Sequence, residues 1–102
     1  MKFKEAVTYD DMLMVPQYSD ITSRSEVDIS SNLGHRNFSL PIIASPMDTV
    51  SEAEMAMAMD KAGGLAVLHR YNSIAEQQDM AMQVNGQVAA AIGVTGDYLE
   101  RA

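Results

Sequence analysis

The chain has 102 residues, enough for one small domain with a modest core. It contains no cysteine, so these residues offer no disulfide, no thiolate metal site and no cysteine nucleophile. The net charge is -7, the basic residues are scattered singly, and no apolar run reaches membrane-spanning length. These features predict no nucleic acid and no membrane as partners, and we expect a soluble cytoplasmic protein.

Residues 1–40 are predicted to form an N-terminal arm followed by a β-hairpin. Polar and apolar residues alternate from Ser25 to Ser30 and again from Phe38 to Leu40, as they do in half-buried strands. Turn-forming residues separate the two segments, so a hairpin is the simplest interpretation of residues 25–40. His35 falls at its tip without a second ligand nearby, which favours an exposed turn residue over a metal ligand.

A strand followed by a helix start repeats from residue 41, with a period of about 24 residues, which is long enough for a parallel crossover. Each strand is a continuous apolar run, as expected when both faces of a sheet are covered. The predicted strands are Pro41–Ala44, Gly64–His69 and Val88–Val94.

Each predicted strand is followed by the pattern of a capping box, in which a glutamate lies three residues after the N-cap. The three pairs are Ser51 with Glu54, Ser73 with Glu76, and Asp97 with Glu100. The first helix is predicted to end at Gly63–Gly64, because glycine readily adopts the left-handed conformation of a helix C-terminus.

Two α/β architectures fit this repeat, a doubly wound sheet and a (β/α)8 TIM barrel. No Gly-x-Gly-x-x-Gly motif follows the first strand, and the third strand is rich in alanine, so we favour the barrel. In this interpretation residues 1–40 are the arm and hairpin, and residues 41–102 form the first two to three βα units. A barrel needs roughly 200 residues or more, so we expect the N-terminal portion of a longer or split enzyme.

Candidate ligand-binding residues lie at the first strand-to-helix junction, Ser45-Pro46-Met47-Asp48. Ligands in α/β proteins bind at the carboxyl ends of strands, which makes Ser45, Met47 and Asp48 the first candidates. An ordinary turn between a strand and a helix explains the same pattern, and both interpretations stay open at this point.

Segments distributed along the chain match one known family: Tyr9–Pro16, Ser25–Asp28, Pro41–Val50, Gly63–Leu65, His69 and Ala90–Val94. They resemble the start of the IMP dehydrogenase and GMP reductase family, whose fold is the βα barrel. The segment from Pro41 to Val50 is highly specific, and the resemblance covers nearly the whole chain.

The resemblance implies roles for individual residues. IMP dehydrogenase oxidises IMP to XMP with NAD through a covalent intermediate on a cysteine, with a monovalent cation such as potassium nearby. In the family, the serine and methionine that match Ser45 and Met47 contact IMP, and the position matching Arg70 lies near the cofactor. Asp48 is expected to fix the turn, because its carboxylate would repel a phosphate. A plain surface role for Arg70 stays open. The complete enzyme is expected to be a homotetramer.

The chain departs from most IMP dehydrogenases because Asn85–Val88 passes directly to the third strand, where a pair of CBS modules is usually inserted. This fits a dehydrogenase without CBS modules or a GMP reductase, which converts GMP to IMP with NADPH. The segment Ala89–Asp97 resembles the dehydrogenase more, whereas His69–Tyr71 resembles the reductase. We favour the dehydrogenase. A truncated, non-catalytic piece that assembles with a complementary chain is the third possibility.

Overall fold

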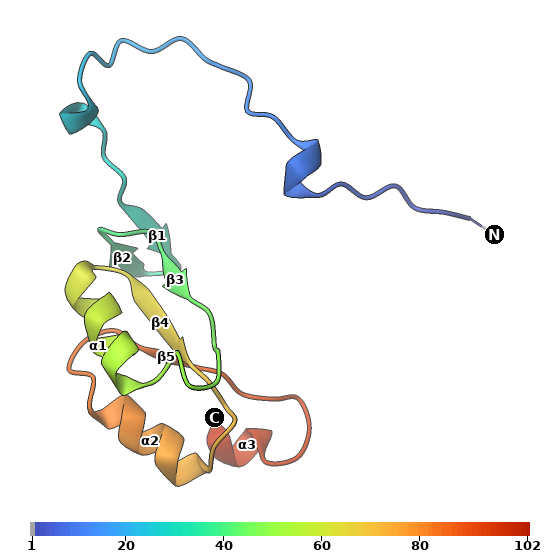
Figure 1. Ribbon diagram of the computed structural model, residues 1–102, viewed down its shortest axis with the longest axis vertical. Coiled ribbons are helices and arrows are strands. Elements are labelled where there is room, and N and C mark those ends of the chain that lie inside the picture. Colours follow the sequence, from blue (N-terminus) through green and yellow to red (C-terminus); the bar gives the residue numbers. More distant parts are fainter. Residues whose placement is uncertain (1) are drawn as a thin grey trace.

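The computed structural model describes residues 2–102 as a mixed α/β protein with two small sheets (Figure 1). A hairpin precedes three βα segments, and short 3₁₀ helices lie at Tyr9–Asp11 and Arg24–Glu26. The elements in chain order are β1 Ser31–Leu33, β2 Arg36–Phe38, β3 Ile43–Ala44, α1 Ala53–Ala62, β4 Leu65–Leu68, α2 Ile74–Met82, β5 Ala89–Ala90 and α3 Tyr98–Arg101.

The second sheet is parallel, with the strand order β3-β4-β5. Ile43 pairs with Leu65, and Val67 pairs with Ala89, so β4 is the central strand. This arrangement confirms the parallel sheet predicted from the three continuous apolar runs. The ordered strands are shorter than those runs, and β5 covers only two residues of the predicted Val88–Val94.

The hairpin pairs β1 with β2 in antiparallel register across a turn that contains Gly34 and His35. Gly34 has a φ of 61°, which a glycine adopts without steric cost. His35 is exposed there. The prediction of a strand over Ser25–Ser30 is wrong: its first two residues end a 3₁₀ helix and the others form no strand. Alternation of polar and apolar residues gives a strand only where a neighbouring strand supplies the backbone hydrogen bonds.

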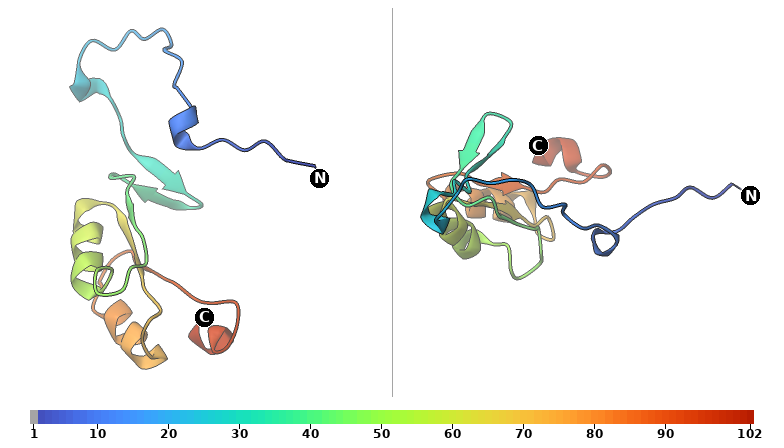
Figure 2. Two further views of the ribbon diagram at one scale, coloured as in Figure 1. Left: turned by 45° about the vertical axis from the view of Figure 1, so that its right-hand side comes forward. Right: turned by 90° about the horizontal axis from the view of Figure 1, so that it is seen from above.

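Residues 2–30 run as an extended arm away from the sheets, and the N-terminal end lies far from the rest of the chain (Figures 1 and 2). Many large apolar side chains of this arm are exposed, among them Phe3, Tyr9, Leu13, Met14 and Tyr18. No helix among residues 2–102 has the length and apolar character needed to cross a membrane.

The core is small and lies between β4 and the two longer helices. Ala56, Ala66, Leu68 and Val84 are buried against one another, and Met59 and Met80 pack around them with three smaller side chains. Small residues on α1 and β4 allow the helix to lie close to the strand, while methionine fills the irregular space that remains.

The three predicted capping boxes have different outcomes. Ser73 caps α2, because its hydroxyl accepts from the Glu76 amide and the Glu76 carboxylate accepts from the Ser73 amide. The hydrogen bonds that the Ser73 amide and, second, the Ser73 hydroxyl donate to the Glu76 carboxylate lower the pKa of Glu76 below its ordinary value. The prediction for Ser51 is wrong, since the N-cap of α1 is Glu52. Asp97 precedes α3 but makes no capping hydrogen bond.

The isolated 102-residue chain is expected to be oligomeric or partly molten. Strands β3 and β5 are the two edges of the parallel sheet, and Ile42 and Ile43 are each about half exposed. Unpaired edges and uncovered apolar faces promote association. Size-exclusion chromatography with light scattering and an amide NMR spectrum test this. A monomer with sharp, dispersed amide signals would contradict it.

Candidate functional site

The carboxyl ends of the three parallel strands lie at one edge of the sheet, and a loop follows each of them (Figure 1). The first loop, residues 45–52, connects β3 to α1 and carries Ser45 and Met47. The second, residues 69–73, follows β4, and the third, residues 91–97, follows β5. Ligands of α/β proteins bind at such an edge, so these loops form the candidate site.

The first loop is a tight turn closed by its own backbone. The amides of Val50 and Ser51 both donate to the carbonyl of Met47, at 3.2 and 2.9 Å. Thr49, which lies between Met47 and Val50 in the chain, has a φ of 59°, in the left-handed region. A β-branched residue is a genuine outlier there and persists only where surrounding contacts hold it.

Ser51 connects the turn to the sheet. Its side chain is buried and donates a hydrogen bond to the carbonyl of Ser45, while its own carbonyl accepts from the amide of His69 at 3.3 Å. These contacts explain why Ser51 does not cap α1: its hydroxyl points back to the start of the turn.

The predicted nucleotide-binding residues Ser45 and Met47 are both exposed on this turn, and Met47 is 54% exposed. Asp48 is exposed as well, with Oδ1 3.9 Å from His69 Nε2. A surface hollow of about 580 Å³ is lined by Thr49 and Val50 of the turn, by residues at the start of α1 and by Met80 of α2, and includes neither Ser45 nor Met47. The two side chains therefore lie on an open surface at the end of β3.

His69 directly follows β4 and is almost completely buried. Its Nδ1 accepts a hydrogen bond from the amide of Tyr71 at 3.2 Å, and its Nε2 lies 3.2 Å from Glu52 Oε1. The sequence alone indicates a strand residue and a family match at His69, and no functional role. Its partner Glu52 is 17 residues away, and no local pattern joins the two.

Arg70, the predicted cofactor-binding residue, is exposed at the end of β4. Its guanidinium carbon lies 5.9 Å from the centre of the Tyr71 ring, and Nη1 lies near Gly93 of the third loop. Within residues 2–102 it forms no ion pair. After the larger contribution of the hydrogen bond from Arg101, the Arg70 charge also lowers the pKa of Asp97, so Arg70 lies within electrostatic reach of that carboxylate.

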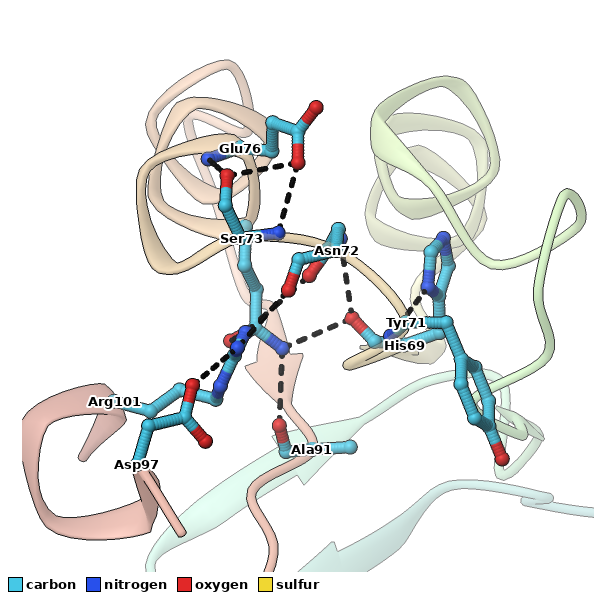
Figure 3. A network of polar contacts seen from close by, with 9 residues as sticks. His69, Tyr71, Asn72, Ser73, Glu76, Ala91, Asp97 and Arg101 are labelled. Atoms are coloured by element: carbon cyan, nitrogen blue, oxygen red, sulfur yellow. Dashed lines mark hydrogen bonds and ion pairs between the residues drawn. The ribbon is translucent and has the colours of Figure 1, made fainter.

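A network of polar contacts joins the second and third loops (Figure 3). Arg101 of α3 donates to the side chain and the carbonyl of Asn72 and to Asp97, at 3.3, 3.0 and 2.7 Å. The hydrogen bond from Arg101 is the main cause of the lowered pKa of Asp97. Buried Gln77 donates to the carbonyls of His69 and Ala91, both at 3.0 Å. No sequence pattern predicts this network, because its members come from separate elements.

One cluster in the described part of the chain has the residue types of a metal site: Asp48, Glu52 and His69, with ligand atoms within 4.8 Å of one another. The hydrogen bond from Tyr71 occupies the lone pair of Nδ1, so the neutral ring carries its proton on Nε2, facing the carboxylates. A cation would need the lone pair of that nitrogen. The arrangement therefore fits a brace, by which we mean a structural hydrogen bond from His69 to Glu52 that holds the first loop, better than a set of metal ligands.

Comparison with known proteins gives consistent relatives. An IMP dehydrogenase / GMP reductase domain matches residues 6–102. The chain is 46% identical over 85 residues to an inosine-5'-monophosphate dehydrogenase of Nitrosopumilus maritimus, which covers 82% of this chain and 18% of that protein.

Two solved structures extend the likeness to three dimensions. The inosine 5' monophosphate dehydrogenase of Legionella pneumophila matches with a TM-score of 0.82 and 36% identity, over 95% of this chain and 31% of that one. A GMP reductase of Trypanosoma brucei, in complex with guanosine 5'-triphosphate, matches with a TM-score of 0.71 and 48% identity, over 76% of this chain and 19% of that one. The chain thus spans less than a third of each relative, and it belongs to the IMP dehydrogenase / GMP reductase domain family.

Proposed function

We propose that the chain is the N-terminal segment of a (β/α)8-barrel IMP dehydrogenase, which oxidises IMP to XMP with NAD in guanine nucleotide biosynthesis. The observation that carries the proposal is the turn after β3. There the highly specific segment Pro41–Val50 exposes Ser45 and Met47 at the carboxyl ends of the parallel strands, where ligands of α/β proteins bind. The 102 residues contain no cysteine, so the covalent nucleophile belongs to another part of the enzyme and this segment alone is inactive.

Ser45 and Met47 are proposed to bind the nucleotide. The Ser45 carbonyl is occupied by Ser51, whereas its exposed hydroxyl is available to donate to a nucleotide oxygen. The exposed Met47 thioether offers a polarisable surface to ribose or base. Asp48 is proposed to fix the turn, since its carboxylate lies toward His69.

Arg70 is proposed to contact NAD, which accepts the hydride from IMP when bound. An exposed guanidinium without an ion pair among residues 2–102 fits the pyrophosphate of a dinucleotide, to which arginine can donate two parallel hydrogen bonds. We propose further that the complete enzyme is a cytoplasmic homotetramer that requires a monovalent cation such as potassium.

GMP reductase, with NADPH as cofactor, is the second candidate. The 48% identity to the Trypanosoma brucei reductase favours it, and the absence of inserted modules between α2 and β5 fits both enzymes. The segment Gly93–Asp97, which resembles the dehydrogenase, decides our choice.

The test is an assay of the full-length enzyme with IMP and NAD against GMP and NADPH. We expect NADH to form from IMP, without inhibition by purine nucleotides at a separate CBS site. Faster turnover of GMP with NADPH would overturn the choice of reaction and leave the nucleotide contacts of Ser45 and Met47 to be judged separately. If neither pair reacted, the proposed catalytic function would fail and a non-catalytic piece would remain.

Substitution of Ser45 with alanine is expected to raise the KM for the nucleotide several-fold, with little change for the dinucleotide. One hydrogen bond contributes on the order of 1 kcal/mol, and somewhat more if the acceptor is charged. Met47→Ala should act in the same direction through lost contact. Steady-state kinetics of the full-length enzyme measure both. An unchanged nucleotide KM together with loss of folding would make Ser45 a structural turn residue only.

A further inference from the structure

The buried His69 side chain joins two loops of the candidate site. His69 follows the carboxyl end of β4. Its ring extends to the loop after β3, where Nε2 lies 3.2 Å from Glu52 Oε1. Its backbone amide donates to the carbonyl of Ser51, the residue before Glu52. One histidine thus holds two successive residues of the neighbouring loop, once through its side chain and once through its backbone.

The hydrogen bonds fix the orientation of the ring. The amide of Tyr71 donates to Nδ1 at 3.2 Å, so the neutral ring carries its proton on Nε2. That proton is directed at the Glu52 carboxylate, with Asp48 further away at 3.9 Å. The side chain of His69 is 3% exposed and that of Glu52 is 49% exposed, so water has little access to the histidine end of the bond.

The turn that precedes Glu52 needs such a contact. Strand β3 pairs through only two residues, and Thr49 holds a left-handed φ of 59° that an isolated turn would relax. Ser51 connects the end of the turn to its beginning through the carbonyl of Ser45. A displacement of residues 51–52 would therefore be transmitted to Ser45 and to Met47, whose carbonyl accepts two bonds within the turn.

We propose that His69 is a positioning residue, which acts through Glu52 and Ser51 to hold the turn that carries Ser45 and Met47. It does not touch the nucleotide in this account. The role in nucleotide binding rests on the proposed function, whereas the role in ordering the turn does not. The same orientation of the ring places a proton where a metal ion would need a lone pair, so the cluster with Asp48 and Glu52 is a brace.

The experiment uses the full-length enzyme with three variants, Glu52→Ala, His69→Asn and the double substitution. Asparagine keeps an acceptor near the position of Nδ1 for the Tyr71 amide and is too short to reach Glu52. Glu54→Ala is the matched control, because Glu54 is an exposed carboxylate on the first turn of α1, two residues from Glu52. Glu52 is itself partly exposed, so its variant keeps the test valid if the buried His69 variant fails to fold.

Two measurements are made on each variant. Hydrogen exchange by mass spectrometry reports on the order of residues 45–52 without reference to any substrate. Steady-state kinetics report the KM for the nucleotide, the KM for the dinucleotide and kcat separately. A purely structural defect would lower stability and kcat together, whereas misplacement of Ser45 and Met47 raises the KM for the nucleotide selectively.

We expect residues 45–52 to exchange faster in both single variants, and the KM for the nucleotide to rise about five- to tenfold with kcat nearly unchanged. The double variant should show no more than the larger single effect, because both substitutions remove the same bond. Glu54→Ala should change neither quantity. If no nucleotide is turned over, the catalytic proposal fails and hydrogen exchange still decides the brace.

Unchanged exchange of residues 45–52 in Glu52→Ala would overturn the proposal, and so would additive effects in the double variant. Calorimetric titration with Zn²⁺ is a further measurement. Stoichiometric binding that is lost in His69→Asn would show that Nε2 offers a lone pair, which would replace the brace with a metal site.

Discussion

Replacing Gln77 with leucine is expected to lower the free energy of unfolding by about 2–4 kcal/mol, because buried polar partners lose their hydrogen bonds. Gln77 is buried on α2, donates to the carbonyls of His69 and Ala91, and accepts from Arg101 Nη1 at 3.2 Å. Leucine is close to glutamine in size, so the volume is nearly kept while all three contacts disappear. Two carbonyls and part of a buried guanidinium would be left without this partner.

Gln78→Leu is the matched control, since the neighbouring glutamine is exposed on the same helix and the same chemical change should have little effect. Urea unfolding of the full-length protein, followed by circular dichroism, gives both values. Equal midpoints for the two leucine variants would show that the network between the loops contributes nothing to stability.

Replacing Gly63 with alanine is expected to cost about 2–4 kcal/mol, for two separable reasons. Gly63 ends α1 with a φ of 85°, a conformation that an L side chain rarely adopts. A Cβ at this position would also collide with Ser39 Oγ and lie 3.2 Å from Ser39 Cβ. A methyl group fits there only if the Ser39 side chain rotates away and its Cβ shifts by a few tenths of an ångström.

Gly34→Ala separates the two reasons. Gly34 also has a positive φ, of 61°, but a Cβ there would meet no atom within 4 Å. Its variant should lose only the conformational part, on the order of 1 kcal/mol. The double substitution Gly63→Ala with Ser39→Gly should recover part of the loss. Equal thermal midpoints for the Gly63 and Gly34 variants would refute the collision.

Local patterns predicted the parallel sheet and one helix start correctly, and they misjudged another helix start with the same residues. Ser51 and Ser73 are both followed by a glutamate three positions on. Ser73 caps its helix, whereas Ser51 is turned toward Ser45 within a loop that the backbone of Met47 closes. The spacing from Ser51 to Glu54 contains no information on this turn, because the left-handed residue Thr49 precedes both of them.

The candidate site was likewise only partly predictable from the sequence. Its first loop could be found from the sequence, because a strand followed by a short polar turn has a clear signature. The contacts that fix its geometry could not, because His69 meets Glu52, and Arg101 meets Asn72, only after the βα units have packed side by side. Such contacts depend on the fold, and residue spacing does not encode them.

The sheet has a consequence for the order of events during synthesis. Ile43 pairs with Leu65 and Val67 with Ala89, so each strand finds its partner one short crossover along the chain. Each pairing needs only the residues of one crossover, so it can form once that crossover has left the ribosome and before the whole chain has been synthesised. The extended arm of residues 2–30 emerges before this sheet and makes no strand pairing with it. While its backbone and apolar side chains stay uncovered, the arm is open to proteases and to capture by chaperones.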